Sequence, residues 1–315
     1  MPTFSRLRGP LRGSGPPAAW RWLAGYLAVW GAATAYLAFK GADWTFPFIA
    51  LGIFGGALTG LAFVLTRNAR PPAIPVLRPG VELAAVLGFL AAYAVGFLGF
   101  GMGALRHAIP AGREQELLVL TVKLLVHVVL PVALLLALGA QVRPLLRTHI
   151  RRPGFWPPLV VLGLLILALL SVVSPSLKQI AGLHASAATL AWAAPATFVW
   201  LALEAGLCEE FLFRAVLQSR LAAVLKTEVG AVVVGALLFA LAHVPGLFLR
   251  GNPEVDGYST DLLQVIAFTV ATLSPIALLF GTLWARTRSL LLIVLLHAAV
   301  DVLPGVADFV KTWAG

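Results

Sequence analysis

Charged and titratable side chains are costly inside apolar stretches, so those that occur there are candidates for chemistry. Carboxylates and imidazoles can activate a water molecule by taking and returning protons. The sequence therefore predicts hydrolysis by an activated water if its carboxylates and histidines meet in one place. The set lies in the last third of the chain and consists of Glu209, Glu210, Arg214, His243, His297 and Asp301.

The spacing of these residues separates their expected roles. Glu210 and Arg214 are four apart, so they share a helix face and are expected to form a supporting ion pair. The Glu209 side chain points about 100° away from that of Glu210 and stays unpaired, which makes it the natural general base. His243 precedes Pro245 and a glycine, which are expected to kink or end its helix and free backbone carbonyls. His243 is therefore expected to help position or deprotonate the water.

Four further charged or titratable residues occur within apolar stretches. Lys123 and His127 repeat the spacing of four, and we interpret them as a basic pair that lines the bundle or reaches for the surface. Glu204 is expected close to the helix face opposite Glu209, as a cavity residue without an assigned role. Cys208 has the character of a packing residue.

The composition determines the environment of this chemistry. Of the 315 residues 60% are hydrophobic and only 11% are charged, whereas soluble domains hold about 25% charged residues. Such a chain cannot hide its apolar surface in a soluble fold. Despite a net charge of +10, the composition excludes a soluble enzyme and a nucleic-acid-binding domain. It predicts an all-α, polytopic transmembrane helical bundle.

Crossing a bilayer takes roughly 20 apolar residues, and nine stretches are long enough. The number of spans is eight if the first stretch is a cleaved signal peptide. With a cytoplasmic N-terminus, 16 of the 23 basic residues fall on the cytoplasmic side. The positive-inside rule therefore predicts the N-terminus inside and the C-terminus outside. The expected spans are 22–39, 45–66, 81–105, 116–140, 157–174, 188–207, 229–249, 262–284 and 289–307.

Three motifs in order, on separate expected spans, resemble the signature of the CPBP family. These are Glu209-Glu210-x-x-x-Arg214, Phe239-x-x-x-His243 and His297-x-x-x-Asp301. The family comprises Abi-domain intramembrane proteases related to type II CAAX prenyl endopeptidases. The resemblance covers about 190–305, so we expect a protease core over 156–315 and N-terminal helices of unassigned role over 1–155.

The final motif position departs from the family. It is most often asparagine there, whose amide can donate a hydrogen bond to a developing oxyanion, whereas ionised Asp301 cannot. Asp301 either carries a proton or orients His297 as carboxylates do behind histidines. We favour the orienting role, with His297 donating to the carbonyl oxygen. Ala215 and Arg288 replace two glycines that are usual in the family.

The resemblance implies an intramembrane endopeptidase that cleaves near the C-terminus of a membrane-associated peptide or protein. Its mechanism is either glutamate-type or metal-dependent, in which case Glu209, His243 and His297 would bind a divalent ion such as zinc. A catalytically inactive immunity or scaffold protein and a proton-coupled carrier are the alternatives. We expect a bacterial cell-membrane protein whose partners are a peptide or protein substrate and the lipid bilayer, without nucleic acid.

Overall fold

The computed structural model of the protein describes residues 16–253 and 255–314, and it is helical without strands over these residues. Within them nine helical segments are long and apolar enough to cross a membrane, which confirms the predicted fold class. Each of the first five begins and ends within a few residues of its expected bounds. They are α1 (Pro16–Phe39); α2 (Phe46–Ala50), η1 (Leu51–Leu58) and α3 (Thr59–Leu65); α4 (Pro79–Ala92), η2 (Tyr93–Gly101) and α5 (Met102–Ala108); α6 (Arg113–Leu124), η3 (Leu125–Val129) and α7 (Leu130–Ala137); and α8 (Trp156–Val173).

Three of the last four spans carry the predicted site residues. Two short helices, η4 (Arg143–Leu146) and α9 (Ser176–Ala181), lie in the connections before them. The four spans are α10 (Ala187–Leu201), η5 (Ala202–Leu207), η6 (Glu210–Gln218) and α11 (Ser219–Leu225); α12 (Glu228–Ala242) and α13 (Val244–Arg250); α14 (Leu262–Thr287); and α15 (Leu290–Trp313).

The sixth span corrects the sequence prediction. It runs for 39 residues, Ala187–Leu225, whereas a span over 188–207 was expected, with Arg214 and Arg220 in a cytoplasmic connection. Both arginines are buried in the bundle, where carboxylates of Glu210 and Glu82 neutralise them. Paired charges lower the hydropathy of a segment without preventing its burial, and this explains why the span was drawn too short.

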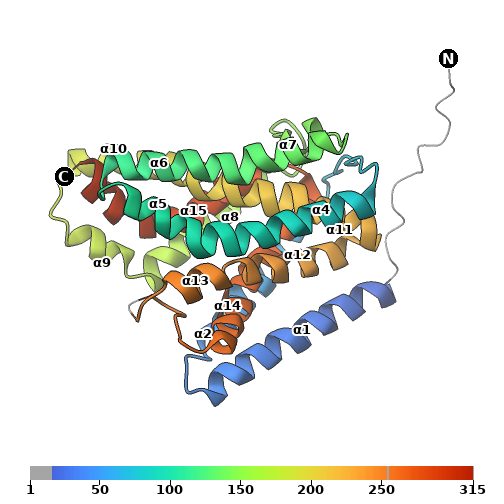
Figure 1. Cartoon of the computed structure of the whole chain (residues 1–315), viewed down its shortest axis with the longest axis horizontal. Helices are drawn as coiled ribbons and strands as arrows, with labels where there is room; N and C mark the ends of the chain where they lie inside the picture. The colour runs from blue at the N-terminus through green and yellow to red at the C-terminus, as the bar shows by residue number, and fades with distance from the viewer. Residues whose placement is uncertain (1–15, 254, 315) are drawn as a thin grey trace.

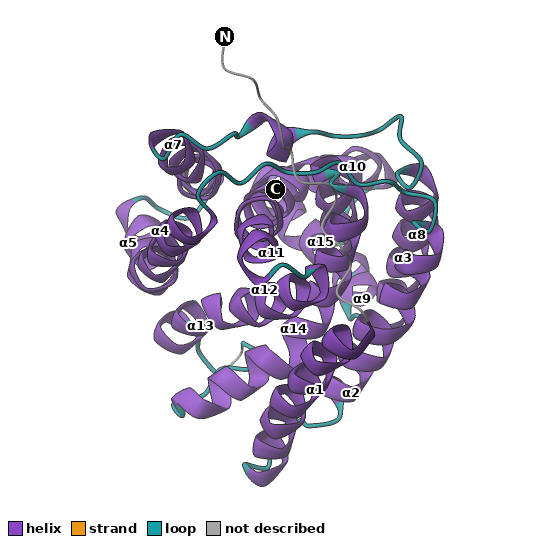
Figure 2. Ribbon diagram, turned by 90° about the vertical axis from the view of Figure 1, so that its right-hand side faces the viewer, coloured by secondary structure: helices purple, strands orange, loops and turns teal. Residues whose placement is uncertain are grey.

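The core of the bundle is made by its last two spans. In α14 and α15 61% of the residues of the most apolar window are buried, against at most 22% in each of the first five spans. Viewed from the end (Figure 2), α11, α12, α14 and α15 occupy the middle, with α4, α5 and α7 on one side and α3 and α8 on the other. The N-terminal spans therefore surround the helices that carry the predicted site.

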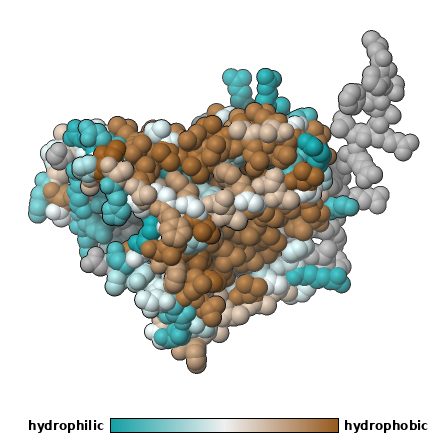
Figure 3. Space-filling view, viewed as in Figure 1, coloured by the Kyte–Doolittle hydropathy of each residue, from teal (hydrophilic) through white to brown (hydrophobic). Residues whose placement is uncertain are grey.

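The surface agrees with a membrane setting. Hydrophobic residues cover the middle of the face shown in Figure 3, and hydrophilic residues gather toward its two ends, which are the ends of the helices in Figure 1. The protein is an integral membrane protein. Its orientation stays a prediction, and Arg6, Arg8 and Arg12, which contributed to the basic asymmetry, lie outside the described residues.

An ion pair at one end of the bundle ties α1 to α14. Lys40 Nζ lies 2.8 Å from Asp261 Oδ2, and the Tyr36 hydroxyl donates to the same oxygen at 2.9 Å. Asp261 also caps α14 by accepting the backbone N–H of Leu263 at 2.9 Å. The Lys40 ammonium and the other donors lower the pKa of Asp261 to about 2.

Candidate active site

Glu209 and Glu210 lie inside the sixth span, where two π-helical turns, η5 and η6, follow each other. The Glu210 side chain is fully buried, and its Oε2 lies 3.3 Å from Arg214 Nε, as the spacing of four predicts. The guanidinium of Arg214 also stacks on Phe239, 4.2 Å from the ring centre. A buried charge needs such partners because lipid and apolar side chains cannot solvate it.

His297 is the meeting point of three carboxylates. Its Nδ1 lies 2.7 Å from Glu210 Oε1, and its Nε2 lies 3.3 Å from Asp301 Oδ2 and 3.9 Å from Glu209 Oε2. The ring stacks on Phe280 with centres 5.2 Å apart. Because Nδ1 faces Glu210, Nε2 is the nitrogen left to exchange a proton on the side of Glu209.

This geometry differs from the roles that the sequence predicted for Asp301 and Glu210. Asp301 was expected to orient His297 from behind, and Glu210 was expected to hold only Arg214. The carboxylate behind Nδ1 is that of Glu210, which uses one oxygen for His297 and the other for Arg214. Asp301 instead contacts Nε2, because a residue one turn further along the same helix reaches the near nitrogen of the ring. Glu210 therefore contacts the nitrogen of His297 at which an orienting carboxylate was expected.

His243 sits at the break that its sequence context predicts. It lies between the end of α12 and the start of α13, with Pro245 in the first turn of α13, where a missing N–H costs nothing. Its Nδ1 donates to the Phe239 carbonyl at 2.8 Å. A neutral imidazole that donates through Nδ1 has its lone pair on Nε2, so His243 can accept a proton or a hydrogen bond from water.

The structure brings Glu209, His243 and His297 together. Glu209 lies within electrostatic range of both histidines, and it accepts no hydrogen bond from the described residues, which leaves its carboxylate available. A carboxylate that accepts no hydrogen bond and is flanked by two imidazoles has the chemical equipment to activate water. The arrangement accounts for every motif residue of the last third of the chain.

A second polar group joins the site to the preceding spans. Lys123 Nζ lies 2.5 Å from Glu204 Oε1, so this lysine lines the bundle interior rather than reaching for the surface. His127 donates from Nδ1 to the Lys123 carbonyl at 2.8 Å, and its Nε2 lies 2.9 Å from the hydroxyl of Tyr93. Tyr93 was not predicted, since an aromatic residue in an apolar run carries no spacing signal.

Glu82 is another buried charge that was not among the predicted candidates. It is fully buried in α4, and its Oε2 accepts from Arg220 Nε at 3.2 Å. Its other oxygen accepts the backbone N–H groups of Leu77 and Arg78, each at 3.0 Å. A lone carboxylate within an otherwise apolar span was the signal that could have found it.

The donor set does not match a metal site as it is arranged. No group of three His, Cys, Asp or Glu side chains in residues 16–253 and 255–314 is placed to hold a metal ion. Both nitrogens of His297 already face carboxylates, from Glu210 on one side and Asp301 on the other. We therefore derive the chemistry below from the side chains alone.

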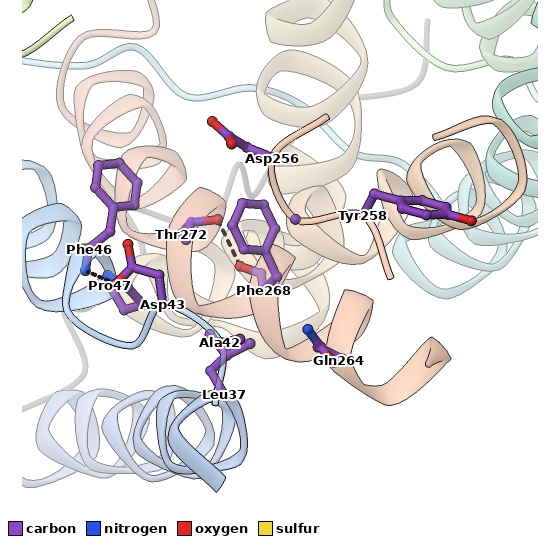
Figure 4. A pocket seen from close by; sticks show the side chains of 11 residues that line it. Leu37, Ala42, Asp43, Phe46, Pro47, Asp256, Tyr258, Gln264, Phe268 and Thr272 are labelled. Atoms are coloured by element: carbon purple, nitrogen blue, oxygen red, sulfur yellow. Dashed lines mark hydrogen bonds between the residues drawn. The ribbon is translucent and has the colours of Figure 1, made fainter. Parts of the chain in front are cut away.

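A separate pocket of about 310 Å³ opens between the α1–α2 connection and the start of α14. Figure 4 shows Asp43, Asp256 and Tyr258 around it, with Phe268 and Thr272 on α14. None of the predicted site residues lines it. The pocket is therefore distinct from the cluster around Glu209.

Comparison with known families bears on the cluster directly. The family model of the type II CAAX prenyl endopeptidase Rce1-like proteins matches residues 191–303. This part of the chain is similar to an Rce1-like domain, and it is called the Rce1-like domain below. It contains all six predicted site residues, and it supports a CAAX-type intramembrane protease in general. No curated protein and no solved structure matches the chain.

The Rce1-like domain accounts for the central helices but not for the whole bundle. It begins in α10 and ends in α15, so Lys123, His127 and Glu82 lie outside it. The predicted boundary between an N-terminal part, 1–155, and a protease core, 156–315, stays a prediction. The buried core itself is continuous, since residues of the first span and of the last belong to one cluster.

Proposed function

We propose that the protein is an intramembrane endopeptidase that hydrolyses a peptide bond near the C-terminus of a membrane-associated peptide or protein. The observation that carries this proposal is the meeting of Glu209, His243 and His297 inside a helix bundle within an Rce1-like domain. We place it in a bacterial cell membrane with its N-terminus in the cytoplasm, on the basis of composition and basic asymmetry.

The water is activated between Glu209 and His243. Glu209 takes a proton as the water oxygen attacks the scissile carbonyl, and the Nε2 lone pair of His243 holds the water in line. When the tetrahedral intermediate collapses, Glu209 returns this proton to the amide nitrogen as the carbon–nitrogen bond breaks and the amine leaves. This assignment of roles rests on two observations. Glu209 accepts no hydrogen bond from the described residues, and His243 Nδ1 already donates to the Phe239 carbonyl.

His297 serves the carbonyl oxygen of the substrate. As negative charge develops on that oxygen, a proton on Nε2 stabilises it, and the contact of Nδ1 with Glu210 keeps the ring in position. Arg214 then holds Glu210 through its second oxygen. Glu210 and Arg214 act as positioning residues, whereas Glu209, His243 and His297 contact the reacting atoms.

The location of the site restricts its substrates. The three spans that carry the motifs are more enclosed than any of the first five spans, with 28%, 39% and 61% of the most apolar window buried against at most 22%. A peptide bond reaches Glu209 only if its segment partitions into the bilayer, which favours chains with an apolar or lipid-bearing C-terminal tail. We expect no nucleic-acid partner, because the excess basic charge fits the orientation signal of a membrane protein.

The test is cleavage by the purified protein in liposomes. Peptides with apolar C-terminal tails, with and without a lipid on a cysteine, are incubated in heavy-oxygen water with wild type and with Glu209→Gln. We expect wild type to release the tail and to place one heavy oxygen in the new carboxylate, and Glu209→Gln to release none. Cleavage at the wild-type rate by Glu209→Gln would refute the proposed role of this residue.

A chelator separates the two mechanisms named above. Because both nitrogens of His297 are occupied by carboxylates, we expect turnover in excess chelator to stay within about twofold of the untreated rate. Loss of activity that added zinc restores would show that the three side chains rearrange around a metal ion.

A further inference from the structure

The fourth span contributes a lysine to the neighbourhood of the site. Lys123 on α6 lies 2.5 Å from Glu204 on η5, and only 13% of its side chain and 19% of that of Glu204 are exposed. Lys123 lies outside the Rce1-like domain, residues 191–303. Nothing in the proposed chemistry uses it, so an ammonium ion buried in the bundle needs a reason.

The helix between Glu204 and Glu209 departs from α-helical geometry. In an α-helix, residues five apart point in clearly different directions, and the two carboxylates were expected on nearly opposite faces. Glu204 instead lies in the π-helical turn η5, which bonds backbone groups five apart and turns less per residue, so residues five apart differ less in direction. Lys123 consequently interacts electrostatically with both Glu204 and Glu209.

The backbone around Lys123 is fixed independently of its ion pair. The Lys123 carbonyl accepts a hydrogen bond from Nδ1–H of His127. The Nε2 of His127 is hydrogen-bonded to the hydroxyl of Tyr93 on η2 of the third span. Tyr93 also contacts Phe213 of the catalytic span, with ring centres 6.3 Å apart. The third, fourth and sixth spans are thereby linked around the turn that precedes Glu209.

We infer that Lys123 is a positioning residue for Glu209. Its ammonium holds Glu204 and with it the η5 turn, so that the carboxylate of Glu209 faces His243 and His297. This inference rests on the proposed function and adds to it a role for the helices before the Rce1-like domain. A displacement of about 1 Å at a catalytic group can lower turnover roughly 100-fold.

The experiment compares four variants in the liposome cleavage assay. Lys123→Met removes the ammonium, Lys123→Arg keeps a cation, and Lys123→Met with Glu204→Gln removes both charges so that no carboxylate is left buried alone. Lys40→Met is the matched control, because Lys40 also pairs with a carboxylate, that of Asp261 at 2.8 Å, but far along the chain from the site. Both kcat and KM are measured per folded molecule.

We expect Lys123→Met and the double variant to lower kcat about 100-fold with KM changed less than about threefold, because alignment is lost while binding is kept. Lys123→Arg should recover most of the rate, and Lys40→Met should match wild type. If Lys123→Met does not fold, the double variant gives the answer alone. Wild-type kcat in the double variant would overturn the inference, since Lys123 would then serve only to neutralise Glu204.

The outcome is distinguishable from failure of the proposed function. If wild type and Glu209→Gln are equally inactive on all peptides, the proposed protease activity is wrong. If wild type cleaves and Glu209→Gln does not, yet Lys123→Met behaves as wild type, only the role assigned to Lys123 is wrong.

Discussion

Two arginines of the sixth span each form a buried pair with a glutamate, Arg214 with Glu210 of the same span and Arg220 with Glu82 of the third span. The two pairs differ in what the second carboxylate oxygen does. Glu210 pairs with Arg214, and its other oxygen contacts an imidazole nitrogen of His297. Glu82 pairs with Arg220, and its other oxygen accepts two backbone N–H groups. A carboxylate whose second oxygen accepts backbone N–H groups has a structural role. A carboxylate whose second oxygen contacts an imidazole can take part in proton transfer.

The comparison extends to burial. All four side chains are at most 3% exposed, so burial alone does not distinguish the two pairs. The groups that contact the second carboxylate oxygen do distinguish them. A peptide N–H does not change its protonation state, whereas a histidine changes its own near neutral pH.

Glu209→Gln should have the largest effect on activity. Glutamine keeps the size of the side chain but cannot take a proton, and general-base catalysis contributes about 10²–10⁴ in rate. We expect turnover to fall by about that factor while the thermal unfolding midpoint in detergent stays at the wild-type value. A variant that unfolds at a much lower temperature would instead show a structural role for Glu209.

Glu210→Gln should lower both activity and stability. Its amide cannot satisfy His297 and Arg214 together, so the histidine loses its orientation and the guanidinium loses its charge partner. Outer contacts of this kind are worth about 10–100-fold in activity, and we expect kcat to fall by that amount. Unfolding followed by scanning fluorimetry should show a lower midpoint, and an unchanged kcat would place orientation of His297 elsewhere.

Asp301→Asn should have the smallest effect. Because Glu210 rather than Asp301 sits behind Nδ1, the substitution leaves the orienting contact intact. It also replaces an acceptor at Nε2 by an amide that can itself donate to an oxyanion. We expect cleavage rates within about threefold of wild type across neutral pH. A loss of 100-fold would restore the orienting role that the sequence alone favoured for Asp301.

Much of the architecture was predictable because hydropathy and spacing are local signals. Stretches of about 20 apolar residues located nine spans, and the spacing of four predicted both Glu210–Arg214 and His297–Asp301. The break at His243 followed from Pro245. The roles of the site residues stay predictions until activity is measured.

The remaining features depend on contacts between distant segments or on irregular helical turns. The Glu210–His297 contact joins residues 87 apart, and the Glu82–Arg220 contact joins residues 138 apart, so no local pattern contains them. The Lys123–Glu204 contact joins residues 81 apart, and Glu204 lies in the π-helical turn η5, whereas the sequence was interpreted with α-helical geometry. The length of the sixth span was misjudged because its charges are paired across helices.

The matched variants Glu210→Gln and Glu82→Gln, assayed together for turnover per folded molecule, test the central claim most directly. Both remove one charge from a buried arginine pair, and breaking such a pair costs about 3–5 kcal/mol of stability. The account predicts that both variants are destabilised, and that the folded fraction of Glu82→Gln turns over at the wild-type rate. Folded Glu210→Gln should be at least about 10-fold slower. Equal rates for the two folded variants would contradict it.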